Sequence, residues 1–107
     1  MVLDRSCMFN ISALDSDKNL IKHEVKALDL IWHQLGFLYT PENTVHVDDL
    51  ARNFALNPNH GVKVKAFRMS RNAMDDELLH LAKYLIKLAS KDKIDSSSGH
   101  KDWKRKM

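Results

Sequence analysis

The chain has 107 residues, which is enough for one modest hydrophobic core and too few for two domains. Its single cysteine, Cys7, excludes an internal disulfide, and the absence of a signal sequence or an apolar run of about 18 residues argues against a membrane anchor. The formal net charge of +3 lies in residues 91–107, and the rest is neutral. We therefore expect a cytoplasmic protein with a single domain at 1–90 and a basic, flexible C-terminal tail at 91–107.

A long amphipathic helix is predicted over about residues 13–36. Apolar side chains recur there in steps of four and three, which places them along one helical face. They are Ile21, Val25, Leu28, Trp32 and Leu35. Ser12 or Ser16 can cap the start of this helix, and Gly36 can adopt the left-handed conformation that ends it.

A shorter middle helix is predicted from Thr44, because Val47, Leu50, Ala51 and Phe54 follow helical spacing. For the next segment, 58–69, the sequence favours helix and strand equally. The pair Asn57-Pro58 is a good helix start, whereas Val62, Val64 and Ala66 alternate with lysines as in a half-buried strand. A strand at 62–67 could pair with 44–47 as a short β-ribbon.

A second long helix is predicted over about residues 73–90. The same apolar rhythm returns at Met74, Leu78, Leu81, Leu85 and Leu88. Asn72 can act as its N-cap, and the acidic residues at 75–77 complement the positive end of the helix dipole. Together these elements predict a mainly α, small helical domain.

The segment 52–71 is basic and contains no acidic residue, which marks a candidate anion-binding face. Residues 47–69 also resemble, loosely, the helix-turn-helix pattern of proteins that read DNA. We therefore predict a regulatory protein that contacts nucleic acid through this segment. The candidate contacts are Arg52, Asn59, His60, Lys63, Lys65, Arg68 and Arg71.

The alternative is a protein–protein adaptor or inhibitor. Two amphipathic helices and an aromatic cluster can exceed what one small domain buries, and surplus apolar surface indicates an interface. The predicted interface residues are Trp32, Leu35, Phe37 and Tyr39, and the predicted assembly is a homodimer.

Enzymatic signatures are thin, so we expect a non-enzymatic protein without cofactor or metal. Glu77 and His80 have the spacing of half a di-iron carboxylate site, but no second pair matches them. Cys7 has no neighbouring base, and the three glycines are too dispersed to cradle a phosphate.

Overall fold

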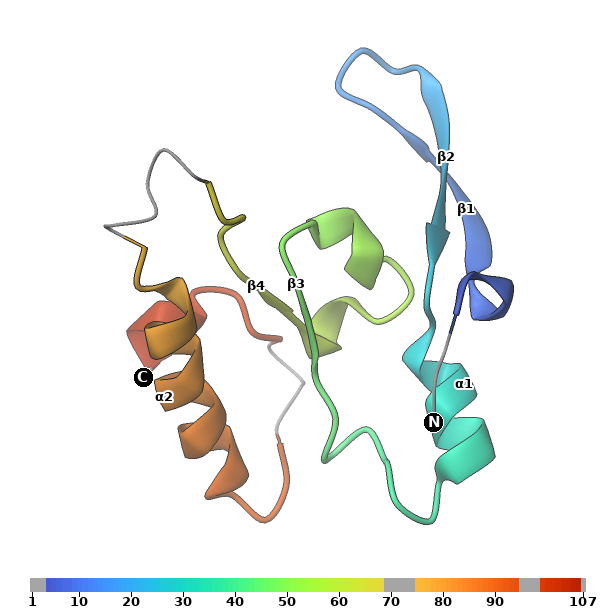
Figure 1. Ribbon diagram of the computed structural model, residues 1–107. Helices are drawn as coiled ribbons and strands as arrows, with labels where there is room; N and C mark the ends of the chain where they lie inside the picture. Colours follow the sequence, from blue (N-terminus) through green and yellow to red (C-terminus); the bar gives the residue numbers. More distant parts are fainter. Residues whose placement is uncertain (1–3, 69–74, 95–98, 107) are drawn as a thin grey trace.

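A computed structural model describes residues 4–68, 75–94 and 99–106 of the chain (Figure 1). These residues form two α-helices, four strands in two separate two-stranded sheets, and several short 3-10 turns. The expectation of a mainly α fold is therefore wrong. None of the described helices is long and apolar enough to cross a membrane.

The first half of the predicted long helix is instead an antiparallel hairpin of β1 (Phe9–Leu14) and β2 (Leu20–Val25). Its turn is held by Asp15, whose carboxylate accepts hydrogen bonds from the N–H groups of Asp17 and Asn19 at 2.9 and 2.8 Å. Aspartate commonly fixes turns in this way. Lys18 completes the turn with a positive φ of 63°.

Only the second half of the prediction is helical, in α1 (Leu28–Leu35). Its first N–H group is capped from a distance, because Leu28 N donates to the side-chain oxygen of Asn57 at 2.9 Å. The indole N–H of Trp32 donates to the Thr44 hydroxyl at 3.2 Å. These two bonds tie α1 to the segments that follow it.

The middle helix is also absent. Strand β3 (His46–Asp48) occupies its start and pairs in parallel with β4 (Gly61–Lys63). The predicted β-ribbon thus exists, but over a shorter span and with parallel strands. The segment 58–69, for which both helix and strand were predicted, contains the 3-10 turn Pro58–His60 and strand β4. Gly61 is required there, since an added Cβ would meet the Phe54 ring at 2.3 Å.

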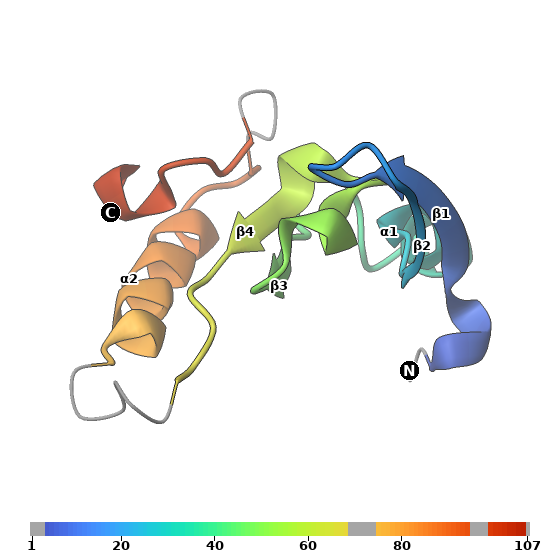
Figure 2. The same cartoon turned by 90° about the horizontal axis from the view of Figure 1, so that it is seen from above.

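The main hydrophobic core lies between β4, helix α2 (Glu77–Ala89) and the 3-10 turn Trp103–Lys106, called η5. Figures 1 and 2 show η5 alongside α2, at the opposite end of the molecule from the hairpin. The core residues are Val62, Leu81, Tyr84, Leu88 and Trp103. The second long helix is thus shorter than predicted; Asn72 and Met74 lie outside the described residues. The segment predicted to be a tail supplies Trp103 to the core.

The molecule is elongated. Its radius of gyration is 15.3 Å, above the value of about 13 Å for a compact chain of roughly 100 residues. The hairpin projects from the body in Figure 1, which accounts for part of this extension.

Candidate functional site

The parallel pair β3 and β4 brings opposite charges to one edge. Asp48 and Asp49 stand where β3 ends, and Lys63 ends β4 as the register partner of Asp48. The Val64 N–H donates to the Asp48 carbonyl at 3.0 Å, so the two chain segments remain adjacent past the strands. In open parallel sheets, ligands bind outside the carboxyl ends of the strands. This edge is therefore the first candidate site.

Asp48 is held firmly at this edge. Its carboxylate accepts hydrogen bonds from the Leu50 N–H at 2.9 Å and from the Asn53 amide at 3.0 Å. Burial raises the pKa of Asp48. The opposing effects are together larger: these two bonds, a hydrogen bond with Asp49 and the charge of His46 all lower the pKa, which therefore lies below the ordinary value. Asp48 is consequently ionised at neutral pH.

His46 lies beside this carboxylate, with 3.7 Å between its Nε2 and an Asp48 oxygen. Burial lowers the pKa of His46, the charge of Asp48 opposes this shift, and the charge of Lys26 adds to it; the net pKa is lowered. The imidazole is therefore mainly neutral at pH 7 and does not cancel the charge of Asp48.

Two adjacent carboxylates at a ligand-binding edge fit a hard cation such as Mg²⁺, which is commonly held by one or two carboxylates together with phosphate oxygens. Within the described ranges, no three His, Cys, Asp or Glu residues cluster closely enough to hold a metal by themselves. Asp48 and Asp49 could therefore supply part of a cation site that the ligand completes.

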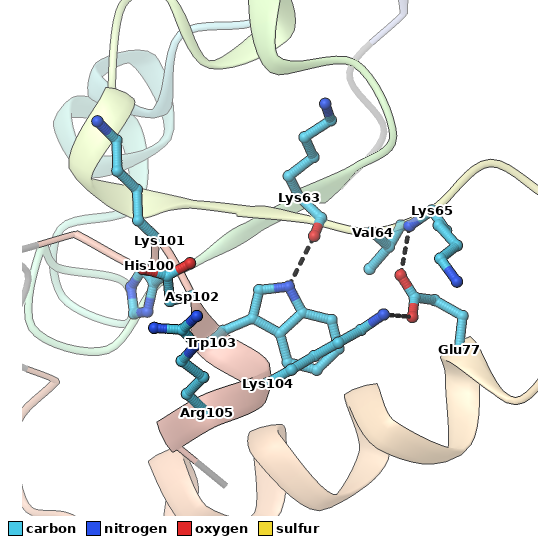
Figure 3. A pocket seen from close by; sticks show the side chains of 10 residues that line it. All are labelled: Lys63, Val64, Lys65, Glu77, His100, Lys101, Asp102, Trp103, Lys104 and Arg105. Atoms are coloured by element: carbon cyan, nitrogen blue, oxygen red, sulfur yellow. Dashed lines mark hydrogen bonds and ion pairs between the residues drawn. The ribbon is translucent and has the colours of Figure 1, made fainter.

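A second feature is a cavity of about 570 Å³ between β4 and η5, which we call the basic cavity (Figure 3). Trp103 lies at its centre and donates its indole N–H to the Lys63 carbonyl at 2.7 Å. The basic residues that line the cavity are Lys63, Lys65, Lys101, Lys104 and Arg105. In Figure 3 the side chains of Lys63, Lys65 and Lys101 point away from the indole ring, whereas Lys104 runs past it toward Glu77. The cavity thus has an aromatic centre and a cationic rim.

Glu77 forms part of the wall of the basic cavity. Its carboxylate accepts a hydrogen bond from the Lys65 N–H and forms an ion pair with Lys104. The Lys104 amino group also lies 5.5 Å from the centre of the Trp103 ring. Burial raises the pKa of Glu77, but these two partners lower it by more, so the net pKa lies below the ordinary value. Glu77 and Lys104 therefore neutralise each other.

His100 is buried in the same wall and is only 3% exposed. Its Nδ1 lies 2.6 Å from the Tyr84 hydroxyl, while its Nε2 has no hydrogen-bond partner among the described residues. Burial lowers the pKa of His100, and the positive charges of Lys106, His60 and Lys91 add to this effect. The ring is therefore mainly neutral at pH 7.

The predicted nucleic-acid contacts lie in different surroundings. Lys63 and Lys65 line the basic cavity, and Arg71 lies outside the described residues. His60 is turned inward, with its Nε2 3.2 Å from the Pro41 carbonyl and its ring against Trp32. The remaining predicted contacts are exposed on other segments, namely Arg52, Asn59 and Arg68.

The predicted interface residues lie on and after α1. Trp32 and Leu35 are half-buried on the helix, whereas Phe37 and Tyr39 are exposed on the segment that follows it. This apolar surface is compatible with association, and the homodimer stays a prediction.

Comparison with known proteins defines the class. Residues 3–95 match the family model of the NLI interacting factor-like phosphatases, so the chain belongs to this family.

Its relatives carry a more specific name. The chain is 39% identical over 84 residues to the ubiquitin-like domain-containing CTD phosphatase 1 of Xenopus tropicalis, an alignment that covers 77% of the chain and 26% of that protein. The identity is 40% over 86 residues to the Danio rerio protein of the same name, covering 77% and 26%, and 40% over 82 residues to the ubiquitin-like domain-containing CTD phosphatase of Arabidopsis thaliana, covering 75% and 24%. The chain thus spans about a quarter of the length of these relatives.

These relationships overturn the functional expectations. We predicted a non-enzymatic protein that contacts DNA or acts as an adaptor or inhibitor. This prediction is wrong, because the family and the relatives are named as phosphatases. The charge segregation in segment 52–71 was real, but it does not identify a nucleic-acid ligand.

Sequence reasoning missed Asp48 and Asp49. The available signal was an acidic pair directly after the alternating segment Val45-His46-Val47, because acids at the end of a strand can mark a ligand-binding edge. It also noted that Glu77 and His80 have the spacing of half a di-iron site, and it rejected that site because no second pair matches them. In the structure Glu77 pairs with Lys104, while the His80 Nε2 lies 2.9 Å from an Asp76 carboxylate oxygen.

Proposed function

We propose that the chain contributes to a phosphatase active site that hydrolyses phosphate monoesters. The observation that carries this proposal is the acidic pair Asp48 and Asp49 at the carboxyl edge of β3 and β4, in a chain that belongs to a phosphatase family. The relatives' name, CTD phosphatase, supports a phosphorylated CTD as the substrate.

The two carboxylates have a definite task in this proposal. They hold Mg²⁺ at the edge, and the bound ion supplies positive charge that a phosphate ester requires. Asp48 is fixed for this task by Leu50 and Asn53, whose hydrogen bonds keep it ionised and oriented. Asp49, which is more exposed, supplies the second carboxylate beside it.

The test measures phosphate release from p-nitrophenyl phosphate and, separately, Mg²⁺ binding by titration calorimetry. Asp48→Asn and Asp49→Asn should each lower the rate of phosphate release and the Mg²⁺ affinity by about tenfold or more, because each removes a ligand charge. Asp17→Asn is the matched control, since it removes the same charge from the exposed hairpin turn.

Each readout addresses a different part of the proposal. Phosphate release that depends on Asp48 and Asp49 supports both the activity and the assigned residues. If Asp17→Asn has the same effect as the two other variants, the edge is not the site. If the chain neither releases phosphate nor binds Mg²⁺, the proposal fails.

A further inference from the structure

Helix α2 is apolar on two sides. The inner side carries Leu81 and Leu88, which are buried in the core. On the outer side, Leu78, Ala82 and Ile86 follow one another at intervals of four residues and therefore form a row along the helix. Leu78 and Ile86 are 74% and 70% exposed. A helix that is apolar all round is normally buried all round, so this outer row indicates a contact surface.

The apolar surface continues beyond the first turn of α2. A hollow of about 470 Å³ lies there, and its apolar walls include Phe67, Leu78 and Leu79. Phe67 and Leu79 are 61% and 59% exposed. Figures 1 and 2 place α2 at the margin of the molecule, far from the hairpin, where a second molecule can approach it. We call Phe67, Leu78, Leu79, Ala82 and Ile86 the outer α2 face.

We propose that the outer α2 face is the contact surface of a homodimer, in which α2 of one molecule packs antiparallel against α2 of a second copy. The charges at the two ends of the helix favour this occupant. Asp75 and Asp76 precede α2, Lys91 and Lys93 follow it, and all four are exposed. Antiparallel packing places each acidic end beside the partner's basic end and also aligns the two helix dipoles favourably. The face is therefore complementary to itself.

The spacing along α2 sets the register of this contact. Ala82 lies midway between Leu78 and Ile86, and its small side chain lets two helices approach to an axial distance of about 8 Å. A two-fold axis beside Ala82 places Leu78 opposite Ile86 of the partner subunit, and the same contact forms a second time by symmetry. Each Ile86 side chain thereby reaches the apolar hollow beside Phe67 in the other molecule. This interface goes beyond the proposed phosphatase function and does not depend on it.

Sedimentation equilibrium at several protein concentrations measures the dissociation constant of the dimer. Leu78→Glu/Ile86→Glu should raise this constant by about a hundredfold or more, because the two-fold axis doubles the number of carboxylates placed in an apolar contact. Both side chains are exposed in the single chain, so the variant should fold, which circular dichroism checks. Leu14→Glu/Phe37→Glu is the matched control. It introduces the same charges at side chains that are 67% and 80% exposed away from α2, and it should change the constant less than about threefold.

Cysteine cross-linking tests the antiparallel direction, in chains that also carry Cys7→Ser so that the native thiol cannot react. Residues 78 and 86 are separated by roughly 12 Å along a helix. A disulfide requires Cα atoms within about 7 Å of each other. A mixture of Leu78→Cys and Ile86→Cys chains should therefore form a cross-linked dimer under mild oxidation, whereas either chain alone should not.

Three results would overturn the proposal. The first is a chain that stays monomeric at every concentration. The second is equal weakening by the two double variants, or stronger weakening by Leu14→Glu/Phe37→Glu, which would move the contact away from α2. The third is cross-linking of Leu78→Cys alone as strong as in the mixture, which would exclude the antiparallel pair. Since none of these measurements involves phosphate or Mg²⁺, their outcome is separate from that of the phosphatase test.

Discussion

The turn end of the β1–β2 hairpin and the core around α2 both contain large apolar side chains, but they bury them very differently. Leu14 and Leu20, which pair at the hairpin end, are 67% and 66% exposed. Val62 and Trp103, in the core between β4 and η5, are 0% and 5% exposed. Two strands alone cannot cover an apolar face, whereas a strand packed beneath a helix can.

This difference predicts where the stability of the chain resides. Side chains that are already exposed lose little when truncated, and buried side chains lose both their transfer free energy and their packing. The hairpin should therefore open locally at low free energy, and the core should open only with global unfolding. Three substitutions test this contrast, in order of expected effect.

Trp103→Ala should lower the free energy of unfolding by about 3–5 kcal/mol, because it leaves a cavity beneath Tyr84 and removes the bond to the Lys63 carbonyl. Leu14→Ala should change it by less than about 0.5 kcal/mol. Urea unfolding followed by circular dichroism measures both. If Trp103→Ala does not fold, Trp103→Phe retains an aromatic ring and reports the lost bond. Equal losses at residues 103 and 14 contradict the contrast.

Glu77→Gln tests the ion pair in the core half and should lower the free energy of unfolding by about 1–3 kcal/mol at pH 7. The pKa of Glu77 is lower in the folded state than its ordinary value of 4.5, so its stabilisation is complete above pH 4.5 and is lost as the pH falls further. The difference between the unmodified chain and Glu77→Gln should therefore narrow below pH 4.5.

Glu24→Gln is the matched control, because Glu24 of β2 pairs with the exposed Arg5, which precedes β1. Such surface pairs contribute roughly 0–1 kcal/mol. Urea unfolding between pH 3 and pH 7 measures both variants. A Glu77→Gln loss that does not change with pH shows that the carboxylate charge contributes nothing.

The sequence was informative where local pattern and tertiary burial coincide. The apolar stripe ending in Leu81 and Leu88 locates α2, since both side chains enter the core. The stripe beginning at Ile21 and Val25 was misleading because the four-residue step between them also keeps two strand residues on one face. His23 occupies the intervening position on that face, so the period of two was hidden.

The candidate site depends more strongly on long-range contacts. The sequence contains Asp48 and Asp49 next to each other, but their place at a carboxyl edge requires the parallel pairing of β3 with β4. The basic cavity likewise requires η5 to fold back onto β4 through Trp103. The local sequence pattern does not show in which direction two strands pair or where a distant segment packs. The charged residues could therefore be recognised in the sequence, but not placed together in a site.

Asn57→Ala tests the link between the two halves and should have the smallest of the three effects, about 1 kcal/mol. Its side-chain oxygen caps the Leu28 N–H, and its amide donates to Asp29 at 3.1 Å. Hydrogen exchange at the Leu28 amide should accelerate in Asn57→Ala. Asp29→Asn, which changes only the acceptor of the second bond, should leave that amide protected. If both variants expose it equally, the hydrogen bond between Asn57 and Asp29, and not the cap, protects this amide and holds α1.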